Sequence, residues 1–367
     1  MSIADANHSS SHWAYYRLLI PIKLMRFGTK YGEILGRAVG ELPPLAVPIH
    51  TFTVKSTSSD RRIKVNVHKN TAALNRPEVP TAVHLNWHGS GWILPGLGTD
   101  SEFIRQVLAH PTLVDQPLTI LDCDYAKSPE YPCPADGEDA RDVYDYVLSH
   151  PDLYDASKIT IGGFSAGGSI ALGLAVELGT EARMRALSEG RKENDFVHPI
   201  KGVFSVYPVA TWEGPRDVVK VPKWLKKTLP GMVLPLWFSK YITNAHLFPP
   251  RRNTGLSWDE ERKRKEELAA RPTVSTLNAE TVDFPNVVEI WTAEYDTLMR
   301  AAEELRVKLQ TERPDAKISG RKVENVGHGW DQMVKRGQLG YTERDEAYES
   351  GARMIALAIG ANTERSL

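Results

Sequence analysis

A serine flanked by two glycines lies between two apolar segments of the chain and has the surroundings of a nucleophile. Residues 159–164 form a short, β-branched run typical of a buried strand, and residues 169–178 are apolar at helical spacing. Gly163 and Gly167 permit a tight turn from strand to helix, because side chains at these positions would collide with the neighbouring elements. Such a turn raises the hydroxyl of Ser165 above the edge of the sheet, where it can attack a carbonyl carbon.

This attack creates a negative charge on the carbonyl oxygen, and two parts of the sequence can stabilise that charge. The N–H of Ala166 lies at the positive end of the predicted helix. The loop His88-Gly89-Ser90-Gly91 follows an apolar run, and a glycine-rich loop can direct its backbone N–H groups toward an oxyanion. A simple turn is the alternative for this loop when its motif is considered alone.

A serine hydroxyl is a weak nucleophile at neutral pH, so it needs a base in contact and an acid that orients the base. With the serine on a turn of this kind, the acid and the histidine are expected later in the chain, each after a strand. The predicted strand 287–291 leads to Asp296, and the predicted strand 318–323 leads to His328. We therefore predict that Asp296 and His328 complete a catalytic triad with Ser165.

Each of these two partners also has a structural alternative. Asp296 could cap a helix, and His328 could lie in a surface loop. The chain order of Ser165, Asp296 and His328, each following a strand, argues against a coincidence. Glu294 and Asp331 stay open as rival acids, although their positions relative to the strands are less favourable.

Strands and helices alternate along most of the chain, which predicts an α/β fold with a mostly parallel, eight-stranded sheet flanked by helices. Apolar runs or alternation predict strands at 52–54, 63–67, 82–87, 118–123, 159–164, 203–207, 287–291 and 318–323. Helical spacing predicts helices at 13–42, 101–108, 140–148, 169–178, 301–310 and 343–359.

The alternation stops between residues 209 and 272, a stretch rich in proline and bulky aromatic residues. We interpret it as an insertion into a core made of residues 46–208 and 273–367. The expected place of the insertion is above the carboxyl ends of the strands, where open α/β sheets bind ligands. We expect at least half of its aromatic side chains to form its own core and some to line an apolar pocket.

Composition excludes several classes of function. The formal net charge is -1, which gives neither the basic footprint of a nucleic-acid-binding protein nor a polybasic membrane signal. The two cysteines, Cys123 and Cys133, cannot form a disulfide framework or a thiolate zinc cluster, and we expect free thiols in a reducing compartment. No metal or cofactor is implied.

The N-terminal region has no pattern of a signal peptide, because residues 1–12 are polar. Residues 15–27 are apolar but interrupted by charges and a proline, and they are too few to span a bilayer. We expect a cytoplasmic protein whose amphipathic N-terminal helix packs on the body or at the mouth of the site. Contact with a membrane surface is the alternative, without stable insertion, and a homodimer stays open.

Five motifs, in this order, resemble the hormone-sensitive-lipase-like branch of the α/β-hydrolase fold. The resemblance covers roughly residues 50 to 360 and rests on residues 88–91, 125–130, 163–168, 294–298 and 327–329. It implies an α/β-hydrolase core with a helical cap formed by residues 1–45 and 209–272. It implies a catalytic triad, which in this sequence is Ser165, Asp296 and His328. The oxyanion-hole donors that it implies are the N–H groups of Ser90, Gly91 and Ala166.

Three positions depart from the pattern of this branch. Ser90 replaces the middle glycine of a triplet and adds a hydroxymethyl group near the oxyanion. Phe164 stands where Asp or Thr is frequent, so a polar support of the turn is lost. Residues 126–128 read Ala-Lys-Ser instead of Arg-Leu-Ala. Together they indicate a divergent member with its own substrate.

The predicted function is that of a cofactor-free serine hydrolase that cleaves esters of small or medium apolar acids or of lipophilic metabolites. A first alternative keeps the site but changes the reaction to elimination, cyclisation or acyl transfer on a natural product. A second is a ligand-binding receptor on a hydrolase scaffold. The retained set of Ser165, Asp296 and His328 argues against the receptor, since receptors of this lineage tend to lose the histidine.

Overall fold

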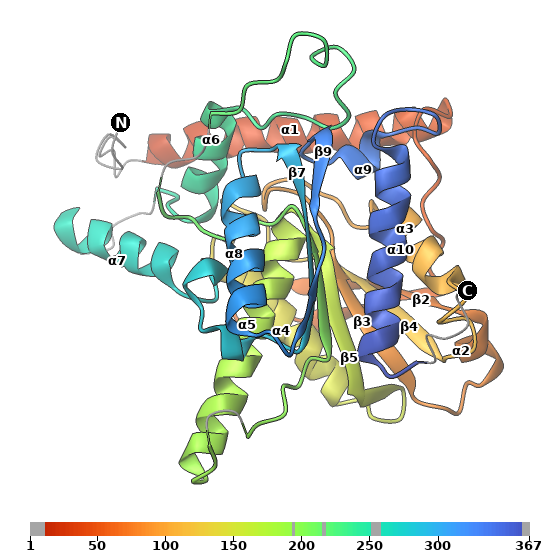
Figure 1. Ribbon diagram of the computed structural model, residues 1–367. Coiled ribbons are helices and arrows are strands. Elements are labelled where there is room, and N and C mark those ends of the chain that lie inside the picture. The colour runs from red at the N-terminus through yellow and green to blue at the C-terminus, as the bar shows by residue number, and fades with distance from the viewer. Residues whose placement is uncertain (1–11, 193–194, 215–217, 251–257, 362–367) are drawn as a thin grey trace.

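The computed structural model describes residues 12–192, 195–214, 218–250 and 258–361. Its centre is one mixed sheet (Figure 1). Eight strands follow each other in the order β1-β2-β4-β3-β5-β6-β7-β8, and β9 pairs with β7. Strands β1 and β2 are antiparallel to their neighbours, and the others are parallel. The strands are β1 (His50–Lys55), β2 (Arg62–Lys69), β3 (Thr81–Trp87), β4 (Leu118–Cys123), β5 (Tyr154–Phe164), β6 (Gly202–Val206), β7 (Val287–Tyr295), β8 (Lys317–Ser319) and β9 (Lys322–Gly327).

The mostly parallel α/β sheet is therefore confirmed, but the single strand predicted at 318–323 is wrong. Two short strands, β8 and β9, occupy this region and are separated at Gly320, whose φ is +94°. A Cβ atom at Gly320 would lie 2.0 Å from the carbonyl oxygen of Ile290, so only glycine lets the chain cross so close to β7. After this crossing β9 runs beside the last residues of β7, which brings the ends of the two strands together.

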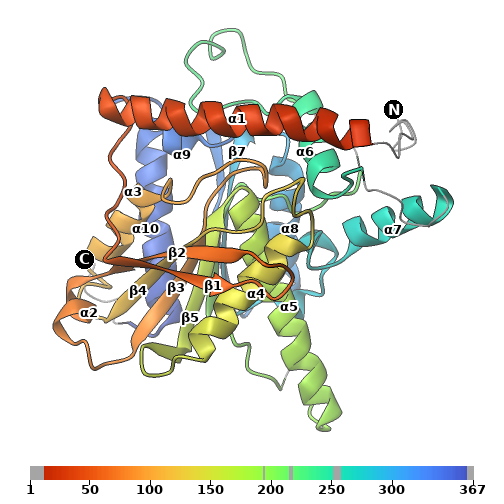
Figure 2. The same cartoon turned by 180° about the vertical axis from the view of Figure 1, so that it is seen from behind.

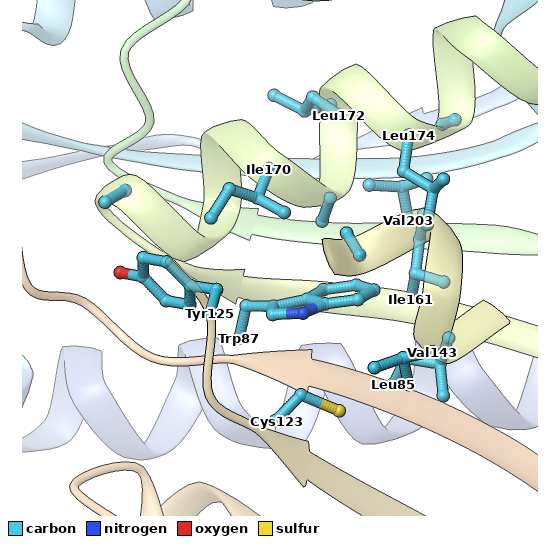
Figure 3. Packing of buried hydrophobic residues seen from close by; sticks show 14 of the residues in the cluster. Leu85, Trp87, Cys123, Tyr125, Val143, Ile161, Ile170, Leu172, Leu174 and Val203 are labelled. Atoms are coloured by element: carbon cyan, nitrogen blue, oxygen red, sulfur yellow. The ribbon is translucent and has the colours of Figure 1, made fainter. Parts of the chain in front are cut away.

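Helices cover both faces of the sheet (Figures 1 and 2). Helices α3 (Ser101–Ala109) and α10 (Tyr341–Ala358) cover one face. Helices α4 (Ala135–Leu148), α5 (Ala166–Ser188) and α8 (Met299–Glu312) cover the other. The first half of α5 is buried all round, as expected for a helix in the middle of a layer. Its side chains pack on Trp87 and Ile161 of the sheet (Figure 3).

Helix α1 (His12–Ala38) extends across the molecule at the carboxyl ends of the parallel strands, and α6 (Leu236–His246) lies next to it (Figures 1 and 2). The hydroxyl of Tyr241 on α6 donates a 2.7 Å hydrogen bond to the carbonyl of Leu18 on α1. Helix α7 (Trp258–Ala270) points away from the body, and α2 (Thr71–Asn75) and α9 (Trp330–Met333) are short. No helix in the described part of the chain is long and apolar enough to cross a membrane.

The aromatic residues of the 209–272 stretch do not all have the expected environment. Trp212 is partly buried and lies 5.1 Å from the ring of Trp92, and three others are also partly buried: Phe238, Tyr241 and Phe248. Trp224 and Trp237, however, are 68% and 69% exposed. The side chains of Trp224 and Trp237 therefore belong neither to a core of this stretch nor to the wall of an enclosed pocket. The side chain of Trp258 lies outside the described residues.

A buried carboxyl in the sheet makes stability depend on pH. Asp122 of β4 is completely buried, and this burial raises its pKa to about 7. In the unfolded chain an aspartate ionises near pH 4, so unfolding releases a proton between about pH 4 and pH 7. The contribution of Asp122 to the free energy of unfolding therefore falls as the pH rises through this range.

We expect Asp122→Asn to remove this part of the pH dependence, because the amide does not titrate and can still accept the 3.3 Å hydrogen bond from Asn66. Urea unfolding at pH 5 and pH 8 measures the effect. The variant should lose less stability than the wild type over this interval, and Asp152→Asn at an exposed position is the control. Equal losses in the wild type and in Asp122→Asn would contradict the expectation.

Candidate active site

The turn between β5 and α5 has the geometry that the flanking glycines predict. Ser165 has φ 51° and ψ −117°, a conformation that is strained for a residue with a side chain. A Cβ atom would lie 2.3 Å from the carbonyl oxygen of Trp87 if placed on Gly163, and 1.8 Å from it if placed on Gly167. The turn is thus pressed against β3, and only glycines fit on both sides of the serine.

Phe164 replaces a polar support with an aromatic one. Its side chain is completely buried under the turn. Its ring centroid lies 5.5 Å from that of Phe103, 6.0 Å from Phe204 and 5.9 Å from Tyr348, in edge-to-face arrangements. Packing of these rings holds the strained backbone from below, so the departure at this position does not leave the turn unsupported.

The structure brings the three residues predicted for the triad into one hydrogen-bonded chain. The Oγ atom of Ser165 is 2.9 Å from Nε2 of His328, and Nδ1 of the same ring is 2.6 Å from Oδ2 of Asp296. The second carboxylate oxygen, Oδ1, accepts a 3.0 Å hydrogen bond from the N–H of Leu298. All three side chains are buried. Asp296 directly follows β7 and His328 directly follows β9, so the crossing at Gly320 creates their contact.

The two rival acids have other partners. Glu294 accepts a 2.7 Å hydrogen bond from the N–H of Asn325 in β9, the strand that leads to the histidine. Asp331 accepts hydrogen bonds from the hydroxyls of Tyr207 and Tyr348, at 2.5 Å and 2.7 Å. Burial raises the pKa of Asp331. Neither side chain contacts the imidazole, so the geometry favours Asp296.

Tyr207 is a supporting residue that the sequence did not indicate. It follows β6, has φ 42°, and places its ring centroid 4.6 Å from that of His328. Its hydroxyl is held by Asp331. Asp331 thus fixes the ring of Tyr207 against the imidazole of His328, without a hydrogen bond of its own to the imidazole. A tyrosine before Pro208 carries no sequence signal for this contact, because it depends on how β6 and β9 are placed by the sheet.

A second support that the sequence did not indicate comes from residues 230–232, which we call the histidine strap. Met232 and His328 exchange two backbone hydrogen bonds in an antiparallel bridge, with N–O distances of 2.9 Å and 2.7 Å. Pro230 accepts a 2.8 Å hydrogen bond from the N–H of Gly327. Gly231, with φ 79°, lies so close that a Cβ atom would be 2.6 Å from the carbonyl oxygen of His328. The 209–272 stretch therefore holds the backbone of the histidine directly.

The loop after β3 lies against the nucleophile. A Cβ atom on Gly89 would be 3.5 Å from Cβ of Ser165, and Gly91 has φ 55°. Within the described chain, the N–H groups of Ser90, Gly91 and Ala166 donate to no protein acceptor. Their role as oxyanion donors stays a prediction, and this geometry is compatible with it.

The hydroxyl of Ser90 is engaged in holding this loop. It is 2.5 Å from the hydroxyl of Tyr125, which donates a 2.9 Å hydrogen bond to the carbonyl of His88. The imidazole of His88 stacks on the Tyr125 ring at 4.8 Å, and its burial lowers its pKa. Lys127 covers the same ring at 3.4 Å and pairs with Asp124 at 2.6 Å. Ser90 and Lys127, which both differ from the usual residues of the family, thus contact the same tyrosine, Tyr125, and help to hold the loop through it.

One group of side chains has the composition of a metal site. Donor atoms of Cys133, Asp136 and His246 lie within 4.8 Å of each other, and all three residues are buried. Hydrogen bonds engage two of these residues, since Trp92 donates to Asp136 at 2.7 Å and Ser128 is 3.1 Å from His246. Burial raises the pKa of the Cys133 thiol, and a protonated thiol is a poor metal ligand. We interpret the group as a hydrogen-bonded cluster and assign it no ligand.

Comparisons with known proteins agree with this architecture. A family model described as the α/β-hydrolase fold matches residues 84–332. The esterase of Pyrobaculum calidifontis is 20% identical, covering 92% of this chain and 94% of its own, with a TM-score of 0.60. A fungal esterase from Rhizomucor miehei is 16% identical, covering 96% of this chain and 99% of its own, with a TM-score of 0.61. At these identities the likeness shows the fold.

Curated relatives match over shorter segments. Versiconal hemiacetal acetate esterase of Dothistroma septosporum is 27% identical over 183 residues, which are 49% of each chain. The carboxylic ester hydrolase LipN of Mycobacterium tuberculosis is 34% identical over 88 residues, 23% of this chain and 22% of its own. The chain thus spans half or less of the length of these two relatives. Because the family model covers more than half of the sequence, the chain belongs to the α/β-hydrolase fold family, in the hormone-sensitive-lipase-like branch that its motifs resemble.

Proposed function

We propose that the protein is a serine hydrolase of the carboxylesterase type. The observation that carries the proposal is the hydrogen-bonded chain from Ser165 through His328 to Asp296, next to a loop with unengaged N–H groups. The names of the two curated relatives, an acetate esterase and a carboxylic ester hydrolase, favour an ester as substrate.

The reaction that we propose proceeds in two halves. Ser165 attacks the ester carbonyl while His328 takes its proton, and the same imidazole then protonates the leaving alcohol. Asp296 keeps the Nδ1 proton in place and stabilises the imidazolium. Water, activated by His328, then attacks the acyl-enzyme and releases the acid. The N–H groups of Ser90, Gly91 and Ala166 stabilise the oxyanion in both halves.

An apolar acyl group of small or medium size is the substrate class that we propose. We assign residues 1–45 and 209–272 to a cap, because α1 and α6 lie over the carboxyl ends of the strands. Ile242 of α6 adjoins the donor loop, since a Cβ atom on Gly91 would lie 3.0 Å from its Cδ1. An aliphatic side chain at this place favours an apolar acyl chain and limits its length.

Hydrolysis of p-nitrophenyl esters from acetate to laurate tests this function. We expect the highest kcat/KM for short or medium acyl chains and a shift toward longer chains in Ile242→Ala. Trp237→Ala is the control, because Trp237 is on the same helix but exposed. If no ester of the series is hydrolysed faster than by Ser165→Ala, the protein is not a carboxylesterase.

The histidine strap leads to a further expected result. In Gly231→Ala the new methyl group collides with the carbonyl of His328, so the imidazole moves relative to Ser165. A misplacement of about 1 Å costs roughly 10²-fold in rate, and we expect a loss of about this size in kcat with little change in KM. The control is Gly214→Ala, which also has a positive φ of 76° but no atom within 4 Å. Equal activities of the two variants would show that the strap does not position the histidine.

A further inference from the structure

Helix α1 is attached to the body by one face. Leu18 and Ile22 are buried on this inner face. The guanidinium of Arg26 donates to the carbonyls of Ile93 and Ser128, both at 2.6 Å, and pairs with Glu130 at 2.7 Å. The orientation of the helix about its axis is therefore fixed, and its opposite face points away from the protein.

This outer face is apolar along the whole helix. Trp13 is 74% exposed, Leu24 67% and Phe27 62%. Globular proteins rarely expose a continuous apolar strip of this length without a binding function. The exposed apolar residues are Trp13, Tyr16, Ile20, Leu24, Phe27, Tyr31, Ile34 and Leu35.

The exposed apolar residues return to one side of the helix along its whole length. Tyr31 follows Trp13 by eighteen residues, which is about five turns of a straight α-helix. The same strip also fits a seven-residue repeat, with Trp13, Ile20, Phe27 and Ile34 at one core position and Arg17, Leu24 and Tyr31 at the other. The spacing is therefore compatible with a flat surface and with a second helix, and the charge around the strip distinguishes these two occupants.

The surroundings of the strip are basic, although the whole chain is nearly neutral. Residues 218–250 contain five lysines and no acidic residue, and the loop before α6 lies on the same side of the molecule as α1 (Figures 1 and 2). Trp224, which is 68% exposed, lies between the exposed Lys223 and Lys226 of this segment. A second copy of the chain would bring like charges together, whereas anionic lipid headgroups complement them.

We propose that the outer face of α1, together with segment 218–240, binds the surface of membranes that contain anionic lipids. The apolar strip enters the interface lengthwise, while lysines beside it contact headgroups, as in helices that lie in the plane of a membrane. The bound face is the one at the carboxyl ends of the strands, where Ser165 lies. If the proposed esterase function holds, lipophilic esters reach the site from the bilayer.

Flotation of the full-length protein with vesicles tests the binding independently of catalysis. The wild type should bind vesicles of phosphatidylcholine with 30 mol% phosphatidylserine more strongly than pure phosphatidylcholine, and less strongly at high salt. Leu24→Glu combined with Phe27→Glu should lower the partition coefficient at least tenfold. Lys30→Glu combined with Lys226→Glu should remove the preference for anionic vesicles. The activity of the first pair on a soluble acetyl ester should equal that of the wild type.

The matched control combines Met184→Glu with Val307→Glu, which change exposed apolar residues on other helices and should leave binding unchanged. Absence of wild-type binding to anionic vesicles, or equal binding by the Leu24 and Phe27 pair, would overturn the proposal. A dimer that this pair dissociates, without vesicle binding by the wild type, would instead assign the face to a second copy. Vesicle binding without ester hydrolysis would overturn only the proposed function.

Discussion

Ser165→Ala should lower kcat for an activated ester by roughly 10⁵-fold or more, which is the effect expected when a triad loses its nucleophile. The variant keeps the N–H groups around the site but has no atom that can form the acyl-enzyme. Its stability should be close to that of the wild type, because the lost hydroxyl contacts only His328 among the described side chains. Steady-state kinetics and thermal unfolding of the purified variant measure both effects.

Two comparisons sharpen this expectation. Ser90→Ala should cost about threefold or less, because the Ser90 hydroxyl is bonded to Tyr125 and the loop is expected to act through its backbone N–H groups. Adding His328→Ala to Ser165→Ala should cause little further loss, since triad residues act as a unit. A large loss in Ser90→Ala, together with a small loss in Ser165→Ala, would show that Ser165 is not the nucleophile and that Ser90 takes part in the reaction.

Asp296→Asn should lower kcat by about 10⁴-fold without unfolding the protein. The N–H of Leu298 will keep the amide oxygen where Oδ1 now lies, so the amide NH₂ will face Nδ1 of His328. The imidazole must then accept at Nδ1 and carry its proton on Nε2, where it cannot take the proton of Ser165. The loss should appear mainly in kcat, and the pH profile of the residual activity should change.

Glu294→Gln and Asp331→Asn are the matched controls for this substitution. Glu294 accepts a hydrogen bond from the backbone of Asn325, and Asp331 holds the hydroxyl of Tyr207, whose ring lies against the imidazole. We expect losses of less than about tenfold in each, far below the loss in Asp296→Asn. Near-full activity in Asp296→Asn, with loss in either control, would reassign the acid.

The parts of the site that the sequence predicts are those carried by local patterns. Gly163 and Gly167 predict the turn because their role is set by contacts within a few residues and with one strand. The order of Ser165, Asp296 and His328 predicts their meeting because parallel strands bring their carboxyl ends to one edge. For the same reason the loop of residues 88–91 is predicted at this edge.

The supports of the site could not be predicted, since they depend on contacts between distant segments. The histidine strap, residues 230–232, pairs with His328 across the fold, and nothing in its sequence resembles a strand. The ring of Tyr207 reaches the imidazole only because β6, β7 and β9 lie side by side. Gly320 divides residues 318–323, which the sequence predicts as one strand. The division could not be predicted, because it comes from the close approach of Gly320 to the carbonyl of Ile290 on another strand. Composition alone likewise could not separate the exposed Trp224 from the partly buried Trp212.

The most direct test of the central claim is the mass of the enzyme during turnover of p-nitrophenyl butyrate, quenched within milliseconds. We predict that an intermediate heavier by one butyryl group accumulates if deacylation is the slower step, and that peptide analysis places this group on Ser165. A burst of p-nitrophenol equal to the concentration of active sites should accompany it. Absence of any acyl adduct, with turnover that survives Ser165→Ala, would contradict a serine hydrolase and favour a reaction that proceeds by proton transfer alone.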